Sequence, residues 1–495
     1  MNGKVILVGA GPGNAGLMTI LGKQVLETAD VVLYDRLVSE EILELIPDSA
    51  HLIDVGKSNG RHPIAQDKIN ALLLKHAKEG KTVVRLKGGD PYLFGRGAEE
   101  LEAVIRENIP FEVVPGVTSA IAAASYAGIP VSHRDYSSSV HIITAHKKNG
   151  ETPDLDFQSL VNLNGTLVFL MGIAAIETVT MGLIKAGMPP ETPAALVENG
   201  TRFNQRKLVS TLADISKQGK VEGFAPPSIL VVGNVCSLHE KLDWVKKLPL
   251  HNIKIINTRP ANRSALSQKL RESGAHVIDF PCISAQPLTL PDRFFEEINL
   301  YNWLVFTSPT GAKIFIKEIR KQKFDIRLLS PVKIATIGEK TAQAFTECGI
   351  IVDYIPTNYN ARELGENLPC TSGDRVLLFR AKDGTPELIN TLQKRGFTVK
   401  DVPVYKTILE KTDPEQVKQM LDRSDIDFIT FTSASTVKGF AAATSDINFD
   451  RSGLKVVCIG EETAAEAKKH GYKTIVSKQA TIESMIEIII EERER

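Results

Sequence analysis

The sequence has 495 residues, of which 43% are hydrophobic, and this length predicts two to four packed domains. Lysine and arginine together number 59, as do aspartate and glutamate, so no net charge attracts nucleic acid or an anionic membrane. No stretch approaches the roughly 18 apolar residues of a membrane-spanning helix. The five cysteines form neither a C-x-x-C pair nor a cluster with metal-ligand spacing. We therefore expect a cytoplasmic protein that binds no metal, membrane or nucleic acid.

The first half alternates short β-branched runs with longer amphipathic stretches, which is typical of α/β domains. Strands are predicted at residues 4–8, 31–34, 82–86, 141–144, 166–170 and 228–232. A proline-glycine pair closes one strand before an alanine-rich helix, and a new strand begins soon after the charged segment that ends at residue 247. We expect one domain at 1–247, with lobes of about 1–115 and 116–247, and a second domain at 253–495.

A glycine-rich turn, Gly9-Ala10-Gly11-Pro12-Gly13, lies between the first strand and the first helix. It is similar to a dinucleotide fingerprint, and Asp35 ends the next strand where a ribose-binding acid would stand. However, Asn14 occupies the position of the third glycine, and Pro12 lacks the N–H that would bind a pyrophosphate. A nicotinamide dehydrogenase is therefore a disfavoured alternative, as is a purely structural turn.

A second glycine-rich segment follows the strand at 82–86. Gly88 and Gly89 would let a flat ligand lie on the backbone, and Asp90 could accept hydrogen bonds from its hydroxyl or ammonium groups. This segment and five others together resemble the uroporphyrinogen III C-methyltransferases over residues 3–247. The six segments are 9–13, 34–38, 84–97, 114–119, 127–130 and 198–201.

The resemblance implies S-adenosylmethionine as methyl donor, a homodimer formed through this half, and Asp35 and Lys57 as proton acceptor and donor. A base that removes the pyrrole N–H proton would make a ring carbon more nucleophilic. Without the resemblance, Asp35 would be a strand-end cap and Lys57 a surface residue. The cofactor site implied by the resemblance consists of Pro12, Gly88, Gly89, Asp90, Leu93, Thr118, Ser119, Met171 and Gly200.

His133 and Arg134 follow a proline turn in the same half. Two side chains that can carry positive charge suit a substrate with eight carboxylates, although both residues could be structural. Three positions depart from the family's usual pattern: Ser119 stands where alanine is common, Ala98 replaces a glycine and Ala145 replaces a glycine. All three are exchanges between small residues.

The second half contains an internal repeat in which matching segments lie about 120 residues apart. The matched segments are 255–259 with 376–380, 306–308 with 431–433, and 337–342 with 459–464. Each copy has a Thr-Ser pair just past a buried strand and an Ile-Gly turn that opens onto a helix. We predict two copies of one α/β unit, whose facing helix starts would offer free N–H groups to anions.

These motifs, with Val404-Tyr405-Lys406-Thr407, resemble the uroporphyrinogen III synthases over residues 253–490. The resemblance implies one lobe from 253–282 plus 405–495 and another from 283–404, and it implies no metal or organic cofactor. Tyr405 would assist the departure of the substrate hydroxyl, or would simply pack at a strand end. The hydroxyl groups of four residues would donate to substrate carboxylates: Thr307, Ser308, Thr432 and Ser433.

The two resemblances predict a bifunctional enzyme of tetrapyrrole synthesis. Its second half would cyclise hydroxymethylbilane to uroporphyrinogen III with inversion of the last ring, and its first half would methylate that product twice to precorrin-2. The alternative is a methyltransferase fused to a sensor that binds a tetrapyrrole without catalysis. The residues leave open whether precorrin-2 goes on to sirohaem or cobalamin, and whether the product passes directly between the halves.

Overall fold

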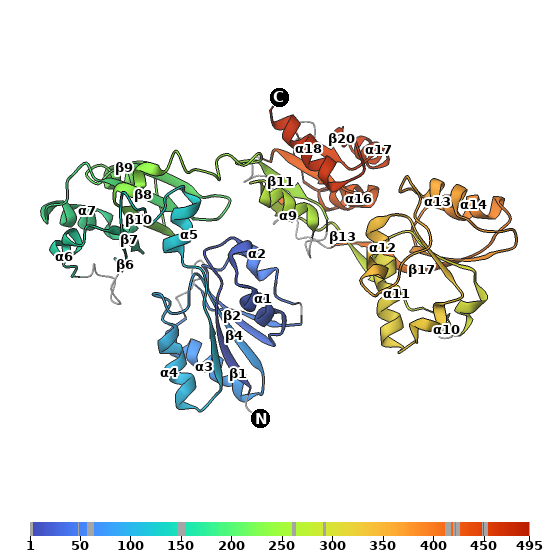
Figure 1. Ribbon diagram of the computed structural model, residues 1–495, viewed down its shortest axis with the longest axis horizontal. Coiled ribbons are helices and arrows are strands. Elements are labelled where there is room, and N and C mark those ends of the chain that lie inside the picture. Colours follow the sequence, from blue (N-terminus) through green and yellow to red (C-terminus); the bar gives the residue numbers. More distant parts are fainter. Residues whose placement is uncertain are drawn as a thin grey trace. The chain divides into compact units, whose positions relative to one another are not determined.

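The computed structural model describes residues 3–47, 49–56, 64–145, 154–259, 264–290, 294–410, 417–418, 421, 426–447, 449 and 454–494. The chain divides into two compact units, Met1–Ile253 with Lys269–His276 and Lys254–Gln268 with Val277–Arg495. Strands and helices alternate along both units (Figure 1), which confirms the predicted α/β class. Among the described helices, none combines the length and apolar character needed to cross a bilayer.

The first sheet consists of five parallel strands in the order β3-β2-β4-β1-β5. Its strands are β1 (Lys4–Gly9), β2 (Val31–Tyr34), β3 (His51–Asp54), β4 (Thr82–Lys87) and β5 (Phe111–Val114). Its helices are α1 (Ile20–Glu27), α2 (Glu40–Leu43), α3 (Gln66–Lys78) and α4 (Gly97–Arg106), with a 3₁₀ turn η1 (Ala15–Leu17).

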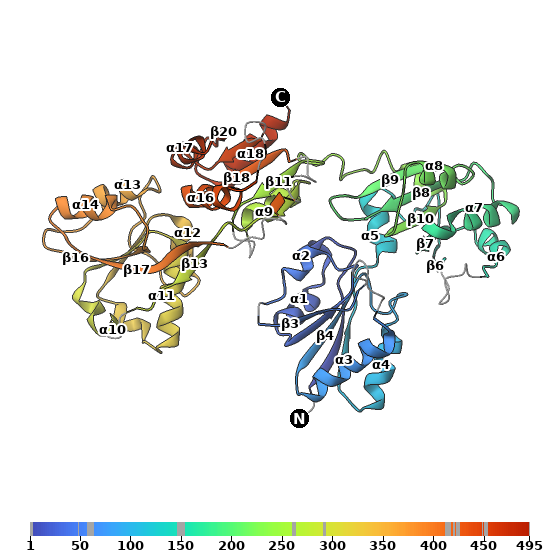
Figure 2. The ribbon, with the colours of Figure 1, turned by 180° about the vertical axis from the view of Figure 1, so that it is seen from behind.

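Alternating side chains of β1 belong to two hydrophobic clusters, as the period of a strand requires. Ile6 and Val8 join the cluster that contains α1 and α2 residues, and Val5 and Leu7 join the cluster of α3 and α4. The two helix pairs lie on opposite faces of the sheet (Figure 2). Because both faces are covered, the inner strands are almost continuously apolar.

The second sheet is mixed and has the order β6-β7-β10-β8-β9, in which only β6 and β7 pair in parallel. Its strands are β6 (Val140–Thr144), β7 (Thr166–Leu170), β8 (Pro193–Glu198), β9 (Arg206–Thr211) and β10 (Ser228–Val232). Its helices are α5 (Ser119–Tyr126), α6 (Phe157–Asn162), α7 (Ile176–Lys185) and α8 (Ile215–Val221), with 3₁₀ turns η2 (Ile173–Ala175) and η3 (Asn234–Leu238). The alanines of α5 pack directly on this sheet.

The chain from Lys254 onward, most of which is the second unit, forms two further five-stranded sheets, in the orders β12-β11-β18-β19-β20 and β13-β17-β16-β14-β15. The first sheet is built from β11 (Lys254–Asn257), β12 (His276–Asp279), β18 (Phe428–Phe431), β19 (Lys455–Cys458) and β20 (Lys473–Val476), with α9 (Ala265–Glu272), α16 (Ala434–Ala443), α17 (Glu461–Lys469) and α18 (Ile482–Arg493). The second is built from β13 (Ile283–Pro287), β14 (Trp303–Phe306), β15 (Lys333–Thr336), β16 (Arg375–Ala381) and β17 (Thr398–Leu409), with α10 (Phe294–Glu297), η4 (Ile298–Leu300), α11 (Pro309–Lys321), η5 (Ile326–Leu329), α12 (Glu339–Thr346), α13 (Ala361–Asn367) and α14 (Glu387–Lys394).

The two sheets of this unit share one strand order, β12-β11-β18-β19 matching β17-β16-β14-β15. The matching helices α9 and α14 both contain 8 residues. The predicted duplication is therefore present in the fold. The chain builds β11 and β12, passes to the second sheet and returns for β18 to β20. Strand β17 extends to Leu409 and pairs with β13, so residue 405 lies inside a strand of the second sheet.

Candidate functional site

The carboxyl ends of β1, β2, β4 and β5 meet at one edge of the first sheet, because these strands are parallel. The predicted residues that follow those ends are Pro12, Asp35, Gly88, Gly89, Asp90, Thr118 and Ser119. The loops after β1 and β4 also bond directly, with Gly11 N–H to the Gly89 carbonyl at 3.1 Å and Gly89 N–H to the Gly11 carbonyl at 2.7 Å. The fold thus gathers residues from four separate segments.

Glycine allows three of these loops to approach backbone to backbone. A Cβ added at Gly9 would lie 2.5 Å from the Gly116 backbone, and one added at Gly116 would lie 2.2 Å from the Gly89 carbonyl oxygen. Gly89 itself has a φ of +69° but no atom within 4 Å of the position its Cβ would take. Its face is therefore open in a conformation that favours glycine, which fits a flat ligand on the backbone.

Asp90 ties these loops together. Its Oδ1 accepts hydrogen bonds from Tyr92 N–H at 2.8 Å and Leu93 N–H at 3.0 Å, and its Oδ2 accepts one from Gly116 N–H at 3.0 Å. A carboxylate has about four acceptor positions, so only the remaining lone pairs are available to a ligand. The structure thus shows an organising role for Asp90 that the sequence reasoning did not foresee.

The second lobe contributes two predicted residues. Met171 follows β7 with a φ of 55°, and 48% of the residue is exposed. It is therefore not the core methionine that its apolar neighbours would suggest by default. Gly200 follows β8, where an added Cβ would lie 2.2 Å from Cβ of Ala123 in α5. Only glycine permits this close packing.

The residues after Gly200 contact both the glycine turn and the loop after β2. Thr201 Oγ1 accepts a hydrogen bond from Asn14 N–H at 3.3 Å, and Arg202 Nη2 donates to the Leu37 carbonyl at 2.6 Å. The Arg202 side chain also lies against Gly13, where it would meet an added Cβ at 2.7 Å. These contacts hold the two lobes of the first unit together beside the predicted site.

Asp35 lies next to a group of three buried charged side chains. Its Oδ1 accepts a hydrogen bond from Leu37 N–H at 3.0 Å, as a strand-end cap would. Its Oδ2 is 3.7 Å from Arg85 Nη2, and its side chain is 25% exposed. Arg85 Nε and Lys87 Nζ each lie 3.1 Å from Glu100 Oε1, and all three side chains are buried. We call Arg85, Lys87 and Glu100 the buried charge cluster.

The buried charge cluster contains two cations and one acid, so Asp35 supplies a second negative charge beside it. Burial lowers the pKa of Lys87, as does the nearby charge of Arg85, whereas Glu100 and Asp35 oppose this shift. Glu100 Oε2 has no hydrogen-bond partner among the described residues. Sequence reasoning missed this cluster, although charged residues at alternate positions of an otherwise apolar strand are a visible signal.

Two of the remaining predicted residues, His133 and Arg134, lie in the second lobe. His133 lies in a tight turn, where its N–H donates to the Ser137 carbonyl at 2.9 Å, and Arg134 is exposed. Within the described part of the chain, no hydrogen bond or ion pair joins either residue to the predicted cofactor site. Lys57 lies outside the described residues.

In the second unit, the structure brings together two predicted residues from distant segments. The Tyr405 hydroxyl donates to Ser308 Oγ at 3.1 Å, and the same oxygen accepts a hydrogen bond from Gly311 N–H at 3.1 Å. Ser308 thus caps α11 and holds Tyr405 at once. Tyr405 also packs partly against a hydrophobic cluster, so both interpretations of this residue have structural support. Thr307 Oγ1 donates to the Phe379 carbonyl at 3.4 Å.

The repeated motif is built in the same way. Ser433 caps α16 in a capping box with Thr436, and Thr432 follows β18 directly. The turns at Gly338 and Gly460 open onto α12 and α17, and neither helix has a side-chain cap. Among the described residues no side chain caps their first N–H groups, and uncapped helix starts are the kind of site that binds anions.

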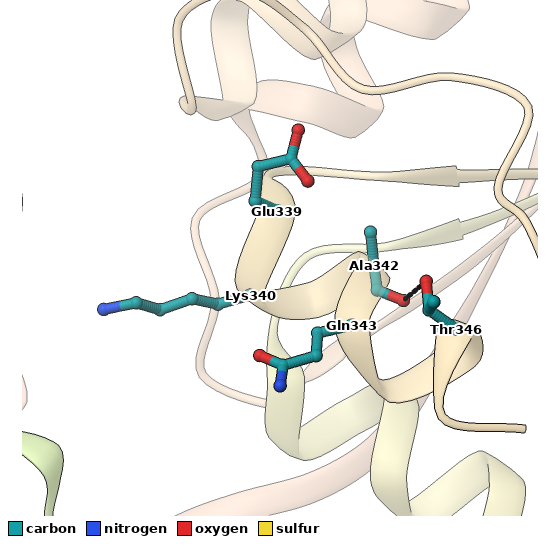
Figure 3. A pocket seen from close by; sticks show the side chains of 5 residues that line it. All are labelled: Glu339, Lys340, Ala342, Gln343 and Thr346. Carbon is teal, nitrogen blue, oxygen red and sulfur yellow. Dashed lines mark hydrogen bonds between the residues drawn. The ribbon is translucent and has the colours of Figure 1, made fainter.

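A depression on the surface of α12 includes the first residues of that helix (Figure 3). It is lined by residues of that helix alone, Glu339, Lys340, Ala342, Gln343 and Thr346, and contains none of the predicted site residues. Within the described ranges, no group of three histidine, cysteine or acidic side chains could hold a metal ion.

Two family models divide the sequence between them. The family described as tetrapyrrole (corrin/porphyrin) methylases matches residues 4–216, and the family described as uroporphyrinogen-III synthase HemD matches residues 264–487. The porphyrin biosynthesis protein HemD of Ruminiclostridium josui is 45% identical over 99% of this chain and 98% of its own length. This chain belongs to the fused tetrapyrrole methylase and uroporphyrinogen-III synthase family.

A second relative that matches most of the chain agrees with that membership. The uroporphyrinogen-III C-methyltransferase of Bacillus subtilis is 38% identical over 94% of this chain and 93% of its own length. A crystal structure of the uroporphyrin-III C-methyltransferase of Thermus thermophilus, complexed with S-adenyl homocysteine, is 38% identical and covers 48% of this chain and 100% of its own, with a TM-score of 0.42. The match of the first half to the methylase family excludes the nicotinamide dehydrogenase alternative.

Proposed function

We propose that this chain is a bifunctional enzyme of tetrapyrrole synthesis. The synthase half cyclises hydroxymethylbilane to uroporphyrinogen III with inversion of the last ring and loss of water. The methylase half then methylates uroporphyrinogen III twice to precorrin-2. The observation that carries the proposal is the joint placement of Asp35, the open face of Gly89 and the loops after β1 and β5 at one sheet edge. The product of one half is the substrate of the other.

The residues of that edge fit S-adenosylmethionine. The open face at Gly89 suits a flat purine ring, and backbone groups of the surrounding loops suit its polar atoms. When bound, this cofactor supplies an electrophilic methyl group on a sulfonium centre. The residues that would hold it are Pro12, Gly88, Gly89, Asp90, Leu93, Thr118, Ser119, Met171 and Gly200.

Asp35 would act as the base of the methylase half. Its Oδ2 would remove the pyrrole N–H proton, so that a ring carbon becomes nucleophilic. The guanidinium of Arg85, whose Nη2 is 3.7 Å from Asp35 Oδ2, would hold this carboxylate in place. Lys57, in the segment after β3, would return a proton. His133 and Arg134 would bind carboxylates of the tetrapyrrole.

In the synthase half, Tyr405 would assist the departing hydroxyl of hydroxymethylbilane. Its hydrogen bond to Ser308 Oγ holds the phenol group in one position, which a general acid requires. Thr307, Thr432 and Ser433, with the uncapped starts of α12 and α17, would bind substrate carboxylates.

Three further proposals concern the whole chain. The methylase domain would comprise residues 1–247, and the synthase domain residues 253–495. The protein would form a homodimer through its methylase half. It would work in the cytoplasm, in agreement with its five unpaired cysteines.

The test supplies hydroxymethylbilane to the full chain with and without S-adenosylmethionine and identifies the macrocycle. We expect uroporphyrinogen III without the cofactor and precorrin-2 with it. Formation of only the uninverted isomer, at the spontaneous rate, would instead favour a synthase half that is a non-catalytic sensor. Failure to methylate supplied uroporphyrinogen III would overturn the proposal for the first half.

A further inference from the structure

The two lobes of the synthase half each contain an arginine at an equivalent position, and the two arginines have different side-chain partners. In the second sheet, Arg380 of β16 forms a two-pronged ion pair with Asp401 of β17, with Nε to Oδ1 at 2.8 Å and Nη2 to Oδ2 at 2.7 Å. Its Nη1 donates to the Gly384 carbonyl. All three guanidinium nitrogens of Arg380 therefore have partners inside the lobe.

In the first sheet, Arg259 is the counterpart of Arg380 and Asp279 is the counterpart of Asp401. Asp279 is the fourth residue of β12, as Asp401 is of β17. However, Asp279 Oδ1 accepts hydrogen bonds from Asn257 Nδ2 at 3.0 Å and from Ser267 Oγ. The acid that would neutralise Arg259 thus bonds to a buried amide and a hydroxyl.

Arg259 therefore has a guanidinium group without a partner among the described residues. Its backbone N–H donates to Asn257 Oδ1 at 3.4 Å, and no described acid lies within ion-pair distance of its side chain. The residue is half-buried, and burial lowers the pKa of its guanidinium. A partly desolvated charge without a partner is unfavourable, so such a site favours binding of an anion.

The surroundings of Arg259 favour an anionic ligand. Strand β11 pairs in parallel with β18, and Asn257 stands opposite Thr430. Two residues further along, Arg259 reaches the same sheet edge as Thr432. Strand β18 in turn pairs with β19, which leads to the uncapped start of α17 at Gly460. An added Cβ at Gly460 would meet no atom within 4 Å, so this helix start is open.

We infer that Arg259 binds a carboxylate of the open-chain tetrapyrrole, as a substrate-recognition residue of the synthase half. This inference rests on the proposed function. A guanidinium matches a carboxylate in a two-pronged geometry, which Arg380 and Asp401 display in the other lobe. The duplicated arginine thus stabilises one lobe and recognises the substrate in the other.

The test compares Arg259→Gln with the matched variant Arg380→Gln in the full chain. Cyclisation is followed against hydroxymethylbilane concentration, together with Tm and the methylation of supplied uroporphyrinogen III. We expect Arg259→Gln to raise KM about 10- to 100-fold, since bonds to charged groups are the strong ones, and to leave Tm nearly unchanged. Arg380→Gln should instead lower Tm by about 3 °C and change KM less.

Arg259→Lys keeps the charge but loses the two-pronged geometry, so its KM should fall between those of the parent and Arg259→Gln. Unchanged methylation in all variants would show that the methylase half is folded, and a cooperative unfolding transition of the synthase half would show the same for that half. A KM of Arg259→Gln close to that of the parent, or a fall in Tm as large as that of Arg380→Gln, would overturn the inference. If the parent chain itself does not cyclise hydroxymethylbilane, the proposed function fails, and the inference fails with it.

Discussion

The candidate sites of the two halves differ in the chemistry that supports them. In the methylase half, Asp35 stands over buried charges, and glycines bring three loops into backbone contact. In the synthase half, a tyrosine hydroxyl bonds to a serine, and helices α12 and α17 begin without side-chain caps. The difference agrees with the proposed reactions, because one half must remove a proton and the other must mainly fold a flexible polyanion.

The strongest test of this comparison is Asp35→Asn, which removes a base with little change in volume. We expect methylation to fall about 10²- to 10⁴-fold, whereas S-adenosylmethionine binding and cyclisation persist. Rates with supplied uroporphyrinogen III and calorimetric titration of the cofactor provide the measurements. Asp214→Asn, before α8, is the matched control and should retain methylation. If Asp35→Asn methylates as fast as the parent, Asp35 is a strand-end cap and not the base.

The buried charge cluster is tested by Glu100→Gln. This change leaves two buried cations without their acid, so the methylase half should lose about 3–5 kcal/mol of its free energy of unfolding. Urea unfolding of the full chain measures this loss, and the transition of the synthase half should not move. The neighbouring Glu99→Gln breaks an exposed pair with Arg96 and should change stability by less than about 1 kcal/mol. Equal effects of the two variants would contradict the role of the cluster.

In the synthase half, the corresponding change is Tyr405→Phe. Because its hydroxyl already bonds to Ser308, we expect a loss near the lower end of general-acid effects, about 10²-fold in cyclisation. More substrate should then close spontaneously to the uninverted isomer, and the isomer ratio reports this. Tyr354→Phe removes a hydroxyl in the same lobe and serves as control. If Tyr405→Phe has the cyclisation rate and the isomer ratio of the parent, then Tyr405 contributes only to packing.

The smallest expected effect concerns pH. Burial lowers the pKa of Lys87 from its ordinary value of 10.5, so the unfolded chain binds this proton more tightly than the folded chain. Stability should therefore rise with pH between the lowered value and 10.5, and this gain should be absent in Lys87→Met. Urea unfolding at several alkaline pH values measures it, with the exposed Lys4→Met as control. An equal alkaline gain in Lys87→Met would assign the effect to another group.

Much of the architecture could be predicted from local signals. Alternating strand and helix periods indicate the α/β class, and matching segments such as those around Ser308 and Ser433 indicate the duplication. Residues that follow parallel strands necessarily meet at one edge, so the gathering of Pro12, Asp35 and Gly89 was predictable from their positions alone. Each of these inferences depends on neighbours in sequence or on a repeat within it.

Other features depended on contacts between distant residues. The pairing of Arg85 with Glu100 joins a strand to a helix, and the bond from Tyr405 to Ser308 spans 97 positions. No local period encodes which partner a buried polar group finds, because that choice depends on burial and on the competing groups nearby.

Asp279 and Asp401 illustrate the limit most clearly. Both stand fourth in matching strands, but they have different partners. The tertiary structure decides this difference, because Asn257 and Ser267 hold Asp279, whereas Asp401 pairs with Arg380. Local patterns in the amino-acid sequence are enough to predict the fold class, the repeat and the sheet edges that carry the candidate sites. Only packing decided which charges are neutralised inside the protein and which remain for a ligand, since this depends on the groups that surround each charge in space.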